Sequence, residues 1–538
     1  MLKMAENTSE TDVVIVGAGI AGLTAAHNIY KKHPTAQIIV LEANGRVGGR
    51  TLTEKLKTAE GKDAFDLGAQ WVGSTQTDVM QLIDELNLTT FNQYHTGIKC
   101  MILGQNGKVR HYKSDIPSLS LLGLWDLHRC ISKIESMSKQ IPLEDPSKCI
   151  HAAEWDAISF AAFKQQLFWT REAHDTIDAA CRCMYGMETS QISLLYFLTY
   201  CAAAGGVRTL TEAGEGSAQE MKIKGGAQQI SSRLMDRIGT EKVLLNQPVS
   251  TIVQDSAGVT IQTKSGDTFH CKRAILAIPP CQINKIDFEP ELPDVKKYLI
   301  NRAPMGNLIK IIITYDKAFW RDAGYSGEIV TNGGKSVVNG CDAGPLCIVY
   351  DNTSAIGSPS IVAFIGGDQA LHWRNTTDTV RKEAVLAGLE SCFGRAALNY
   401  VQYIEKDWAN EMYVGGCPTT SVCVGAMTYF AKGLRQPFNR IHFAGTESAV
   451  RWCGYMSGAV QSGNRAANEV LFHLKPDVLT KEEREHVKDS LLPQKQSNRR
   501  VSLVEKVVGH HVFRWTIGIG SVCVLLVIAK KAYFRIAL

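Results

Sequence analysis

The 538-residue sequence has little excess of either charge, because 58 lysines and arginines face 53 aspartates and glutamates and leave a formal net charge of +5. So small an imbalance over this length gives no indication of a nucleic-acid partner. Charged residues make up 21% and hydrophobic residues 45%. This composition is typical of a folded globular protein, and it excludes a disordered, collagen-like or polytopic membrane chain.

The fifteen cysteines include no C-x-x-C pair and no Cys/His spacing suited to zinc. We therefore expect reduced, mostly buried thiols and no metal site. The N-terminal MLKMAENTSETD has no apolar h-region and no Arg-rich amphipathic stretch. Neither a secretory signal nor a cleaved mitochondrial presequence is expected.

A βαβ unit is present near the start of the sequence. Asp12–Val16 is the continuous apolar run that a parallel strand buried on both faces requires. Residues 23–30 are predicted to be helical, and Gln37–Glu42 is predicted to be the second strand. A glycine-rich turn joins the first strand to the helix.

That turn has the pattern Gly17-x-Gly19-x-x-Gly22. In a dinucleotide-binding turn the first glycine makes the bend, the second admits a pyrophosphate and the third packs the helix on the strand. Glu42 ends the second strand twenty positions after Gly22 and is expected to bind the ribose hydroxyls, which argues against NADP. This motif by itself does not separate NAD from FAD.

Later segments supply further elements. Strands are predicted at 243–253, 258–263, 274–278 and 440–445, and a small-residue helix at 454–471. The segments between them mix helix (161–180) with strand (308–315). We expect a discontinuous cofactor domain (1–95, 226–300 and 405–474), a substrate domain (96–225 and 301–404), a linker (475–511) and a C-terminal segment (512–538).

Two further stretches favour FAD. Arg46-Val47-Gly48-Gly49-Arg50-Thr51 and Asp66-Leu67-Gly68-Ala69-Gln70-Trp71 resemble the extended FAD signature of the flavin amine oxidase superfamily. In that signature a diglycine turn and two arginines lie along the pyrophosphate. Solvated surface charges are the alternative interpretation of Arg46 and Arg50, and the two glycines fixed between them disfavour it.

The C-terminal half carries the same resemblance. Trp408, Tyr413-Val414-Gly415-Gly416-Cys417, Phe443-Ala444-Gly445-Thr446-Glu447 and Trp452-Cys453-Gly454-Tyr455-Met456 resemble segments of the monoamine oxidase family in order and spacing. The resemblance implies a two-domain α/β flavoprotein with a Rossmann-like FAD domain, an α+β substrate domain and a C-terminal membrane helix.

The resemblance also implies how FAD is held. It places a thioether between the flavin and Cys417, where a thiolate is the natural nucleophile. A small buried hydrophobe is the ordinary interpretation of any single cysteine. The cofactor-binding positions implied are Gly17, Gly19, Gly22, Glu42, Arg46, Gly48, Gly49, Arg50, Val249, Trp408, Cys417, Gly445, Thr446, Glu447, Tyr455 and Met456.

Three residues are candidates for handling the substrate. Lys310 interrupts an apolar strand that would normally exclude a charge, and the family places there a lysine that holds a water against the flavin; a salt-bridged structural lysine is the alternative. Tyr455 matches one wall of the family's aromatic cage, but Pro418 stands where the second aromatic is expected. Gln219 resembles the glutamine that positions substrate, and a surface polar residue is an equally weighted interpretation.

The implied reaction is oxidative deamination of a primary amine, and also of a secondary one, to aldehyde, ammonia and hydrogen peroxide, with O2 as oxidant. Direct hydride transfer and a polar nucleophilic route both stay open. A polyamine oxidase, a protoporphyrinogen-type oxidase and a weakly active or inactive membrane-anchored flavoprotein are the alternatives. The preferred amine is left open, and a homodimer is a further arrangement considered.

The segment Trp515–Ala529 holds fifteen uncharged, mostly apolar residues between Arg514 and Lys530. At 1.5 Å per residue it spans about 22 Å against a hydrocarbon core of about 30 Å, so spanning needs snorkelling flanks. We expect a single-pass tail anchor rather than a buried core helix. The family resemblance then implies the mitochondrial outer membrane, with the body facing the cytosol.

Overall fold

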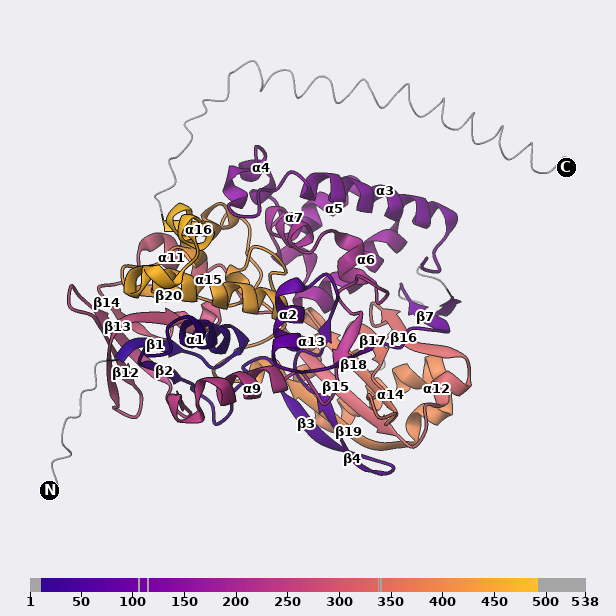
Figure 1. Ribbon diagram of the computed structural model, residues 1–538. Helices are drawn as coiled ribbons and strands as arrows, with labels where there is room; N and C mark the ends of the chain where they lie inside the picture. The colour runs from indigo at the N-terminus through magenta and orange to yellow at the C-terminus, as the bar shows by residue number, and fades with distance from the viewer. Residues whose placement is uncertain (1–10, 105–106, 114–115, 337, 339–340, 492–538) are drawn as a thin grey trace, which may run out of the picture. The chain divides into compact units, whose positions relative to one another are not determined.

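The computed structural model describes residues 11–491 except 105–106, 114–115, 337 and 339–340 (Figure 1). Its larger sheet has eight strands, and β20 (Ile441–Phe443) joins it by pairing with the end of β13. The order of the other seven is β10 (Val243–Leu244), β2 (Ile38–Leu41), β1 (Thr11–Val16), β13 (Thr268–Leu276), β12 (Val259–Thr263), β11 (Val249–Gln254) and β14 (Asp287–Glu289).

Strand β1 shows why this sheet is built from continuous apolar runs. Val13 and Ile15 belong to one hydrophobic core, whereas Val14 and Val16 belong to another on the opposite face. Successive side chains of a strand point to opposite faces, so a strand covered on both sides has no polar positions to spare. Strands β10, β2, β1, β13 and β20 run parallel, as the predicted βαβ unit requires.

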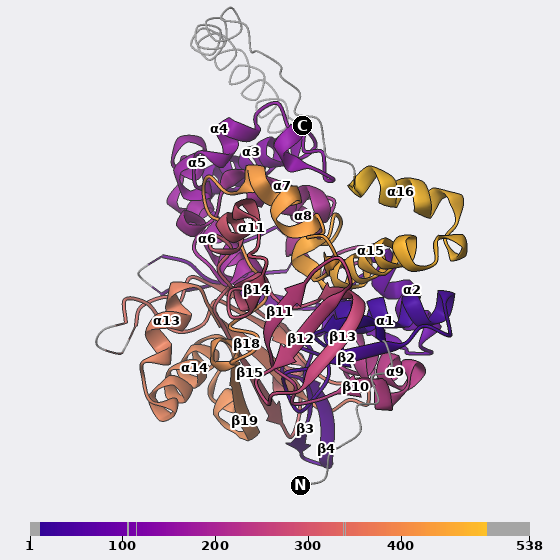
Figure 2. The same ribbon diagram turned by 90° about the vertical axis from the view of Figure 1, so that its left-hand side faces the viewer.

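Helices distant in the sequence cover one face of this sheet. Helix α1 (Ile20–Lys32) packs on α15 (Met456–Leu474), and α2 (Thr77–Glu85) and α9 (Gln229–Ile238) share their core (Figures 1 and 2). A Cβ atom on Gly463 of α15 would lie 2.4 Å from the Ala21 carbonyl oxygen. The close approach of the two helices therefore depends on a glycine at this position.

The second sheet has seven strands in the order β19 (Tyr400–Asp407), β15 (Leu308–Tyr315), β18 (Ser360–Gly366), β17 (Ile348–Asp351), β16 (Tyr325–Thr331), β7 (Ile98–Ile102) and β8 (Val109–Tyr112). Strand β15 is buried along its whole length. Ile309, Ile311 and Ile313 face one core, and Leu308 and Ile312 face another. The alternation places Lys310 on the Leu308 face, which leads to the functional site.

The remaining elements connect these sheets or cover them. A helical layer with its own core comprises α3 (Leu121–Ser138), α4 (Ala152–Asp156), α5 (Phe160–Leu167), α6 (Arg171–Tyr185), α7 (Leu194–Ala203) and α8 (Val207–Thr211). Two small sheets pair β3 (Thr53–Thr58) with β4 (Gly61–Asp66), and β5 (Trp71–Val72) with β9 (Met221–Ile223) and β6 (Thr90–Asn92). The other helices are α10 (Pro280–Ile283), α11 (Asp294–Ile300), α12 (Phe319–Asp322), α13 (Asp368–Arg374), α14 (Asp378–Phe393) and α16 (Lys481–Leu491).

The element predictions hold with two differences of detail. The strand predicted at 243–253 is two strands, β10 and β11, which pair at different places in the larger sheet. The helix predicted at 161–180 is two helices, because the backbone is extended at Phe168 and Thr170, where the Thr170 side chain caps α6. The local hydrophobic periodicity of the sequence did not predict either interruption. The predicted domain boundaries stay a prediction.

The predicted membrane anchor is corrected. Within residues 11–491, as far as they are described, no helix is both long enough and apolar enough to cross a bilayer. The segment Trp515–Ala529, on which that prediction depended, lies outside the described residues. The membrane helix and the mitochondrial outer-membrane location inferred from it are therefore without support and are withdrawn.

Candidate active site

One cavity of about 310 Å³ brings together most of the residues singled out in the sequence. Its lining combines the glycine-rich turn of the larger sheet with the Lys310 face of the second sheet. The predicted residues in this lining are Gly17, Gly19, Glu42, Gly48, Gly49, Arg50, Gln219, Val249, Lys310, Trp408, Cys417, Gly445, Thr446, Tyr455 and Met456. Gly22, Arg46 and Glu447 are not part of it.

The three glycines of the motif have different surroundings, and these can be compared with the role that the spacing predicts for each. Gly17 has a φ of +103°, and a Cβ there would lie 2.7 Å from the Ala277 carbonyl oxygen. A Cβ on Gly22 would lie 1.9 Å from the Gly17 carbonyl oxygen, so this glycine packs the helix on the turn. A Cβ on Gly19 would meet nothing closer than the Gly49 Cα at 4.0 Å. A side chain at Gly19 would therefore occupy space open for a ligand, which fits a bound pyrophosphate.

Glu42 stands at the end of β2, buried at the edge of the cavity. Its Oε2 accepts a hydrogen bond from the Ala18 amide at 2.8 Å, and its Oε1 accepts two from Asn44, from the backbone N at 2.9 Å and from Nδ2 at 3.0 Å. These bonds hold the carboxylate in one orientation, and each oxygen has further acceptor capacity. The position suits recognition of ribose hydroxyls.

The two arginines of the signature have different environments. Arg46 donates to the carbonyl oxygens of Thr51 and Gly49 at 3.0 Å each, so it fixes its own loop and does not reach the cavity. Arg50 lines the cavity and makes a bidentate ion pair with Glu447, with N–O distances of 2.6 and 3.1 Å. Burial would raise the pKa of Glu447, but Arg50 and backbone hydrogen bonds bring it below its usual value. Glu447 therefore orients Arg50 rather than touching a ligand.

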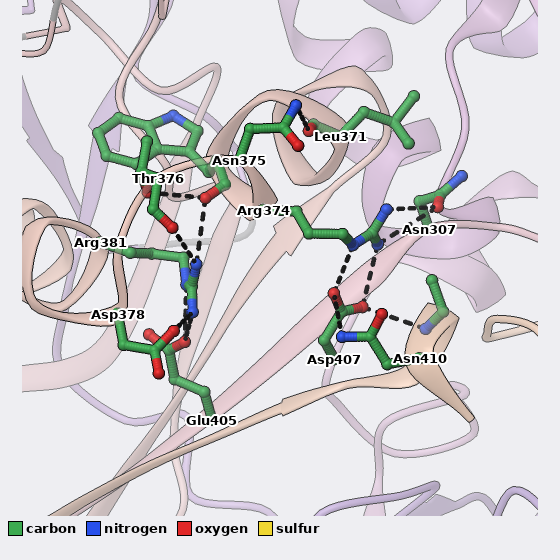
Figure 3. Close-up of polar contacts among 12 residues, drawn as sticks. Asn307, Leu371, Arg374, Asn375, Thr376, Asp378, Arg381, Glu405, Asp407 and Asn410 are labelled. Carbon is green, nitrogen blue, oxygen red and sulfur yellow. Dashed lines mark hydrogen bonds and ion pairs between the residues drawn. The ribbon is translucent and has the colours of Figure 1, made fainter. Parts of the chain in front are cut away.

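A polar cluster that includes Arg374 and Asp407 lies at the end of β19, next in the chain to Trp408 (Figure 3). The Arg374 guanidinium binds both carboxylate oxygens of Asp407, and the Asp407 Oδ1 accepts from the Ala409 amide at 3.1 Å. Asp407 thereby caps the short 3₁₀ helix η5 (Trp408–Asn410). The Trp408 indole nitrogen donates to the Leu67 carbonyl oxygen at 2.9 Å. The Trp408 side chain, which lines the cavity, is thus held by its backbone and by its indole nitrogen.

Lys310 is buried without a carboxylate in contact. Its Nζ donates to the Gly68 carbonyl oxygen at 2.8 Å and to Gln70 Oε1 at 2.5 Å. Burial lowers the pKa of Lys310 to about 7, although Asp66 opposes this shift. Two of its three Nζ positions are used, so one hydrogen or lone pair is left. Among the described residues, Lys310 Nζ makes these hydrogen bonds and no ion pair.

Cys417 lies on the cavity wall between Gly416 and Pro418, and its amide donates to the Gly306 carbonyl oxygen at 3.0 Å. Burial raises the pKa of this thiol to about 12, against the opposing effect of Arg50 and Lys310. The thiol is therefore protonated at neutral pH in this environment. A Cβ on Gly416 would lie 2.4 Å from the Gly306 carbonyl oxygen, so the turn before Cys417 depends on glycine.

Tyr455 lines the cavity together with Tyr200 and Pro418. The centroid of its ring lies 5.9 Å from that of Tyr200 and 5.1 Å from that of Trp452, to which it is nearly perpendicular. The Pro418 carbonyl oxygen accepts a hydrogen bond from Arg50 at 3.0 Å. Tyr455 and Pro418 thus line the same cavity, and the two-walled cage stays a prediction.

Gln219 also lines the cavity and is partly buried. Its Nε2 donates to the Leu210 carbonyl oxygen at 3.2 Å, whereas its Oε1 is buried without a hydrogen-bond partner. A buried acceptor left unpaired costs free energy unless a ligand satisfies it. This observation favours a role in binding a donor group.

Sequence reasoning missed several lining residues. Trp71, Tyr200 and Phe364 give the cavity further aromatic faces, and Gln70 binds Lys310. Gln70 and Trp71 end the second signature stretch, so a signal for them was present. Tyr200 and Phe364 lie in apolar runs, where the sequence does not distinguish a cavity wall from core.

Comparisons with known proteins find similar chains over most of the sequence. A family model described as "Flavin containing amine oxidoreductase" matches residues 20–471. The Dictyostelium discoideum protein named "Probable flavin-containing monoamine oxidase A" is 36% identical, over 85% of this chain and 97% of its own length. The amine oxidase [flavin-containing] A of Canis lupus familiaris is 35% identical, over 86% and 85% respectively. The structure of cyclohexylamine oxidase from Brevibacterium oxydans superposes with a TM-score of 0.80 at 30% identity, covering 87% of this chain and 100% of that one.

Proposed function

This chain belongs to the flavin-containing amine oxidoreductases, and from that premise we propose how its own residues divide the work. It is an FAD-dependent amine oxidase: amine, O2 and water are converted to aldehyde, ammonia and hydrogen peroxide. FAD supplies the redox chemistry, because it takes two electrons from the amine and passes them to O2. The protein binds FAD and the amine, orients them toward each other and excludes water from the site.

The nucleotide half of the cavity has the residues that FAD needs. The Gly17 to Gly22 turn and the Gly48–Gly49 turn offer open backbone to a pyrophosphate, and Arg50 offers a cation held by Glu447. Glu42 would accept from the ribose hydroxyls. Val249, Gly445, Thr446 and Met456 complete the proposed binding surface.

The other half handles the amine and O2. We assign Gln219 to the amine, since its unpaired Oε1 is the acceptor an amino group requires. Tyr455 gives the amine an aromatic face, and Lys310 holds a proton or a water beside the flavin. The observation that carries this assignment is that a single cavity is lined by the glycine-rich turn and by Lys310, Gln219 and Tyr455 together.

Peroxide release across primary amines, diamines and acetylated polyamines tests this function. We expect primary monoamines to be oxidised, because the described lining brings no carboxylate to the Lys310 end that would hold a second cationic nitrogen. Preference for diamines would favour a polyamine oxidase instead. No peroxide with any amine, despite full flavin loading, would favour the inactive flavoprotein.

We further propose that FAD is bound covalently at Cys417. The thiol lies on the cavity wall beside Lys310 and Arg50, on a turn that glycine shapes. Acid-precipitated and digested protein should retain yellow colour on the peptide containing Cys417.

Cys281 is a matched control for this test, because it is another partly buried thiol of the same core, with its Sγ 3.6 Å from the Val414 carbonyl oxygen. Cys281→Ala should keep the bound flavin and Cys417→Ala should release it into the supernatant. Release of all flavin from the wild-type protein would contradict the proposal.

We also retain the division into a cofactor domain (1–95, 226–300 and 405–474) and a substrate domain (96–225 and 301–404). In its support, strands of the larger sheet come from the first set of segments, and most strands of the second sheet come from the other. Limited proteolysis should cut at these boundaries before it cuts within either domain.

A further inference from the structure

A second cavity of about 200 Å³ shares one residue with the active site. Its lining includes Asp63, Asp66, Lys222 and Asn352, and Gln70 belongs to the linings of both cavities. Gln70 is only 2% exposed, so its side chain forms part of the wall between them. Nothing derived above gives the second cavity a role.

A continuous chain of side chains passes from Lys310 through this wall. Lys310 Nζ donates to Gln70 Oε1 at 2.5 Å, and Gln70 Nε2 donates to Asn352 Oδ1 at 3.3 Å. Lys222 Nζ approaches the same Asn352 Oδ1 at 3.5 Å and donates to the Thr353 carbonyl oxygen at 3.1 Å. Asn352 Nδ2 donates to Ser360 Oγ at 3.3 Å.

The direction of these bonds fixes the two amides. Lys222 can only donate, so Asn352 must present its oxygen toward Lys222 and toward Gln70. Gln70 must then donate with its amide nitrogen, which leaves its oxygen facing Lys310. A reversed Gln70 would set two donors against each other at Lys310 and two acceptors at Asn352. Lys222 and Lys310 therefore favour the same orientation of Gln70, from opposite ends of the chain.

Several charges face this chain. Asp66 acts on both lysines, and Asp351 and Arg321 act on Lys222. Asp66 is itself held by Thr53 Oγ1 at 2.6 Å and by the Ala227 amide at 2.9 Å. Burial lowers the pKa of Lys222 to about 8. Such a lysine is costly to bury. Its two contacts to the loop at 352–353, at 3.5 and 3.1 Å, offset little of that cost.

We propose that Lys222, Asn352 and Gln70 are positioning residues for the oxidative half-reaction, which act by holding Lys310 in one orientation toward the flavin. This inference rests on the proposed function of Lys310. Gly68 and Gln70 occupy two of the three hydrogen-bonding positions on Lys310 Nζ. The tetrahedral geometry of the amino group then fixes the direction of the third. Loss of the Gln70 orientation would let Lys310 rotate without dislodging it from β15.

Stopped-flow kinetics of the flavin-loaded enzyme separate the two half-reactions. We expect Lys222→Met and Asn352→Leu to slow reoxidation by O2 three- to tenfold, while anaerobic reduction by amine stays within twofold. Asn352→Asp keeps the acceptor oxygen and should restore most of the rate. Lys224→Met, which removes an exposed lysine two residues along the chain from Lys222, is the matched control and should behave as wild type.

A double variant tests whether the network acts through Lys310. Lys310→Met combined with Lys222→Met should reoxidise no more slowly than Lys310→Met alone, because residues of one unit are not additive. If the effects of the two substitutions on the reoxidation rate multiply, the inference is overturned. It is also overturned if Lys222→Met and Asn352→Leu reoxidise normally while Lys310→Met is slow. The proposed role of Lys310 would survive either result. Normal reoxidation in Lys310→Met would overturn the role proposed for Lys310 and, with it, this inference. If Lys222→Met fails to load flavin, Lys222→Gln is used in its place.

Discussion

At the scale of single residues, Lys310 has the environment of a group kept for chemistry. Burial lowers its pKa to about 7, and its hydrogen bonds go to a carbonyl and an amide rather than to a carboxylate. Removing it therefore leaves no orphaned negative charge, in contrast to breaking a buried ion pair.

We predict that Lys310→Met keeps a melting temperature near that of the wild type and slows flavin reoxidation at least tenfold, or about 1.4 kcal/mol of barrier. Thermal unfolding and stopped-flow mixing with O2 measure the two effects. Unchanged reoxidation with a large loss of stability would show that the lysine serves the fold.

We predict that Pro418, which lines the cavity, affects how the amine is held. If Pro418 takes the place of the second aromatic wall, it offers no π-face, and a small amine is then less well oriented than between two rings. Mispositioning by about 1 Å can cost on the order of a hundredfold in rate. We predict slow turnover of small aryl-alkyl amines and greater tolerance of bulky or branched ones.

Pro418→Tyr should raise kcat for phenethylamine-type substrates at unchanged flavin content. The Pro418 carbonyl that accepts from Arg50 is a backbone group, so the variant retains it. Lower covalent flavin with no kinetic gain would instead mean that proline shapes the attachment turn, since it fixes φ beside Cys417.

At the scale of elements, strand β19 is fastened at two places by arginines (Figure 3). Arg374 of α13 binds Asp407 at the end of the strand, beside Trp408. Arg381 of α14 binds Glu405 in the strand and Asp378 of its own helix. Both clamps join a helix to the same strand, but only the Arg374 clamp extends into the turn that carries Trp408.

We predict that Arg374→Ala weakens flavin binding, because an unpaired Asp407 no longer holds the η5 cap and Trp408 loses its fixed position. Arg381→Ala is the control: it should lower the melting temperature by a comparable amount and leave flavin content unchanged. The flavin-to-protein absorbance ratio and thermal unfolding report the two properties. Equal flavin loss in both variants would contradict the argument.

At the scale of the whole molecule, three buried lysines link stability to pH. Lys310 and Lys222 are linked through Gln70 and Asn352, whereas Lys296 contacts carbonyl oxygens of residues 433–436. Burial lowers the pKa values of Lys310, Lys222 and Lys296 to about 7, about 8 and about 7 from 10.5. Below the folded pKa, each is protonated in both states and its burial costs stability. Above 10.5 each is neutral in both states, and that cost is gone. Between these limits the unfolded chain binds more protons, so the free energy of unfolding gains a contribution that rises with pH.

Lys296 allows this link to be tested away from the active site. Its Nζ contacts the Gly433 and Gln436 carbonyl oxygens at 3.2 and 2.5 Å, and Glu469 and Arg465 are the charges that act on it. We predict that Lys296→Met reduces the slope of unfolding free energy against pH between about 7.5 and 9 by up to about 1.4 kcal/mol per pH unit. Urea denaturation at several pH values measures it, with Lys224→Met as the exposed control. An unaltered slope would mean that Lys296 keeps an ordinary pKa.

Local motifs in the sequence were enough to predict the dinucleotide-binding unit, and most of the residues predicted for the site line the cavity. Gly17, Gly19, Gly22 and Glu42 are close in the chain, so their spacing fixes their geometry through one turn and one strand pair. Lys310 was also visible, because a charge inside an apolar strand departs from the alternation that the rest of the strand follows.

The tertiary structure alone decided which side chains meet across long separations. Arg46 and Arg50 look equivalent in sequence, yet only Arg50 reaches the cavity, because its partner Glu447 arrives from the far end of the chain. Gln70, Asn352 and Lys222 come from three separate segments of the chain, and no local pattern marks them as neighbours. Hydrogen bonds between these side chains depend on positions that the packing of whole sheets fixes. Periodicity along the chain therefore does not predict them.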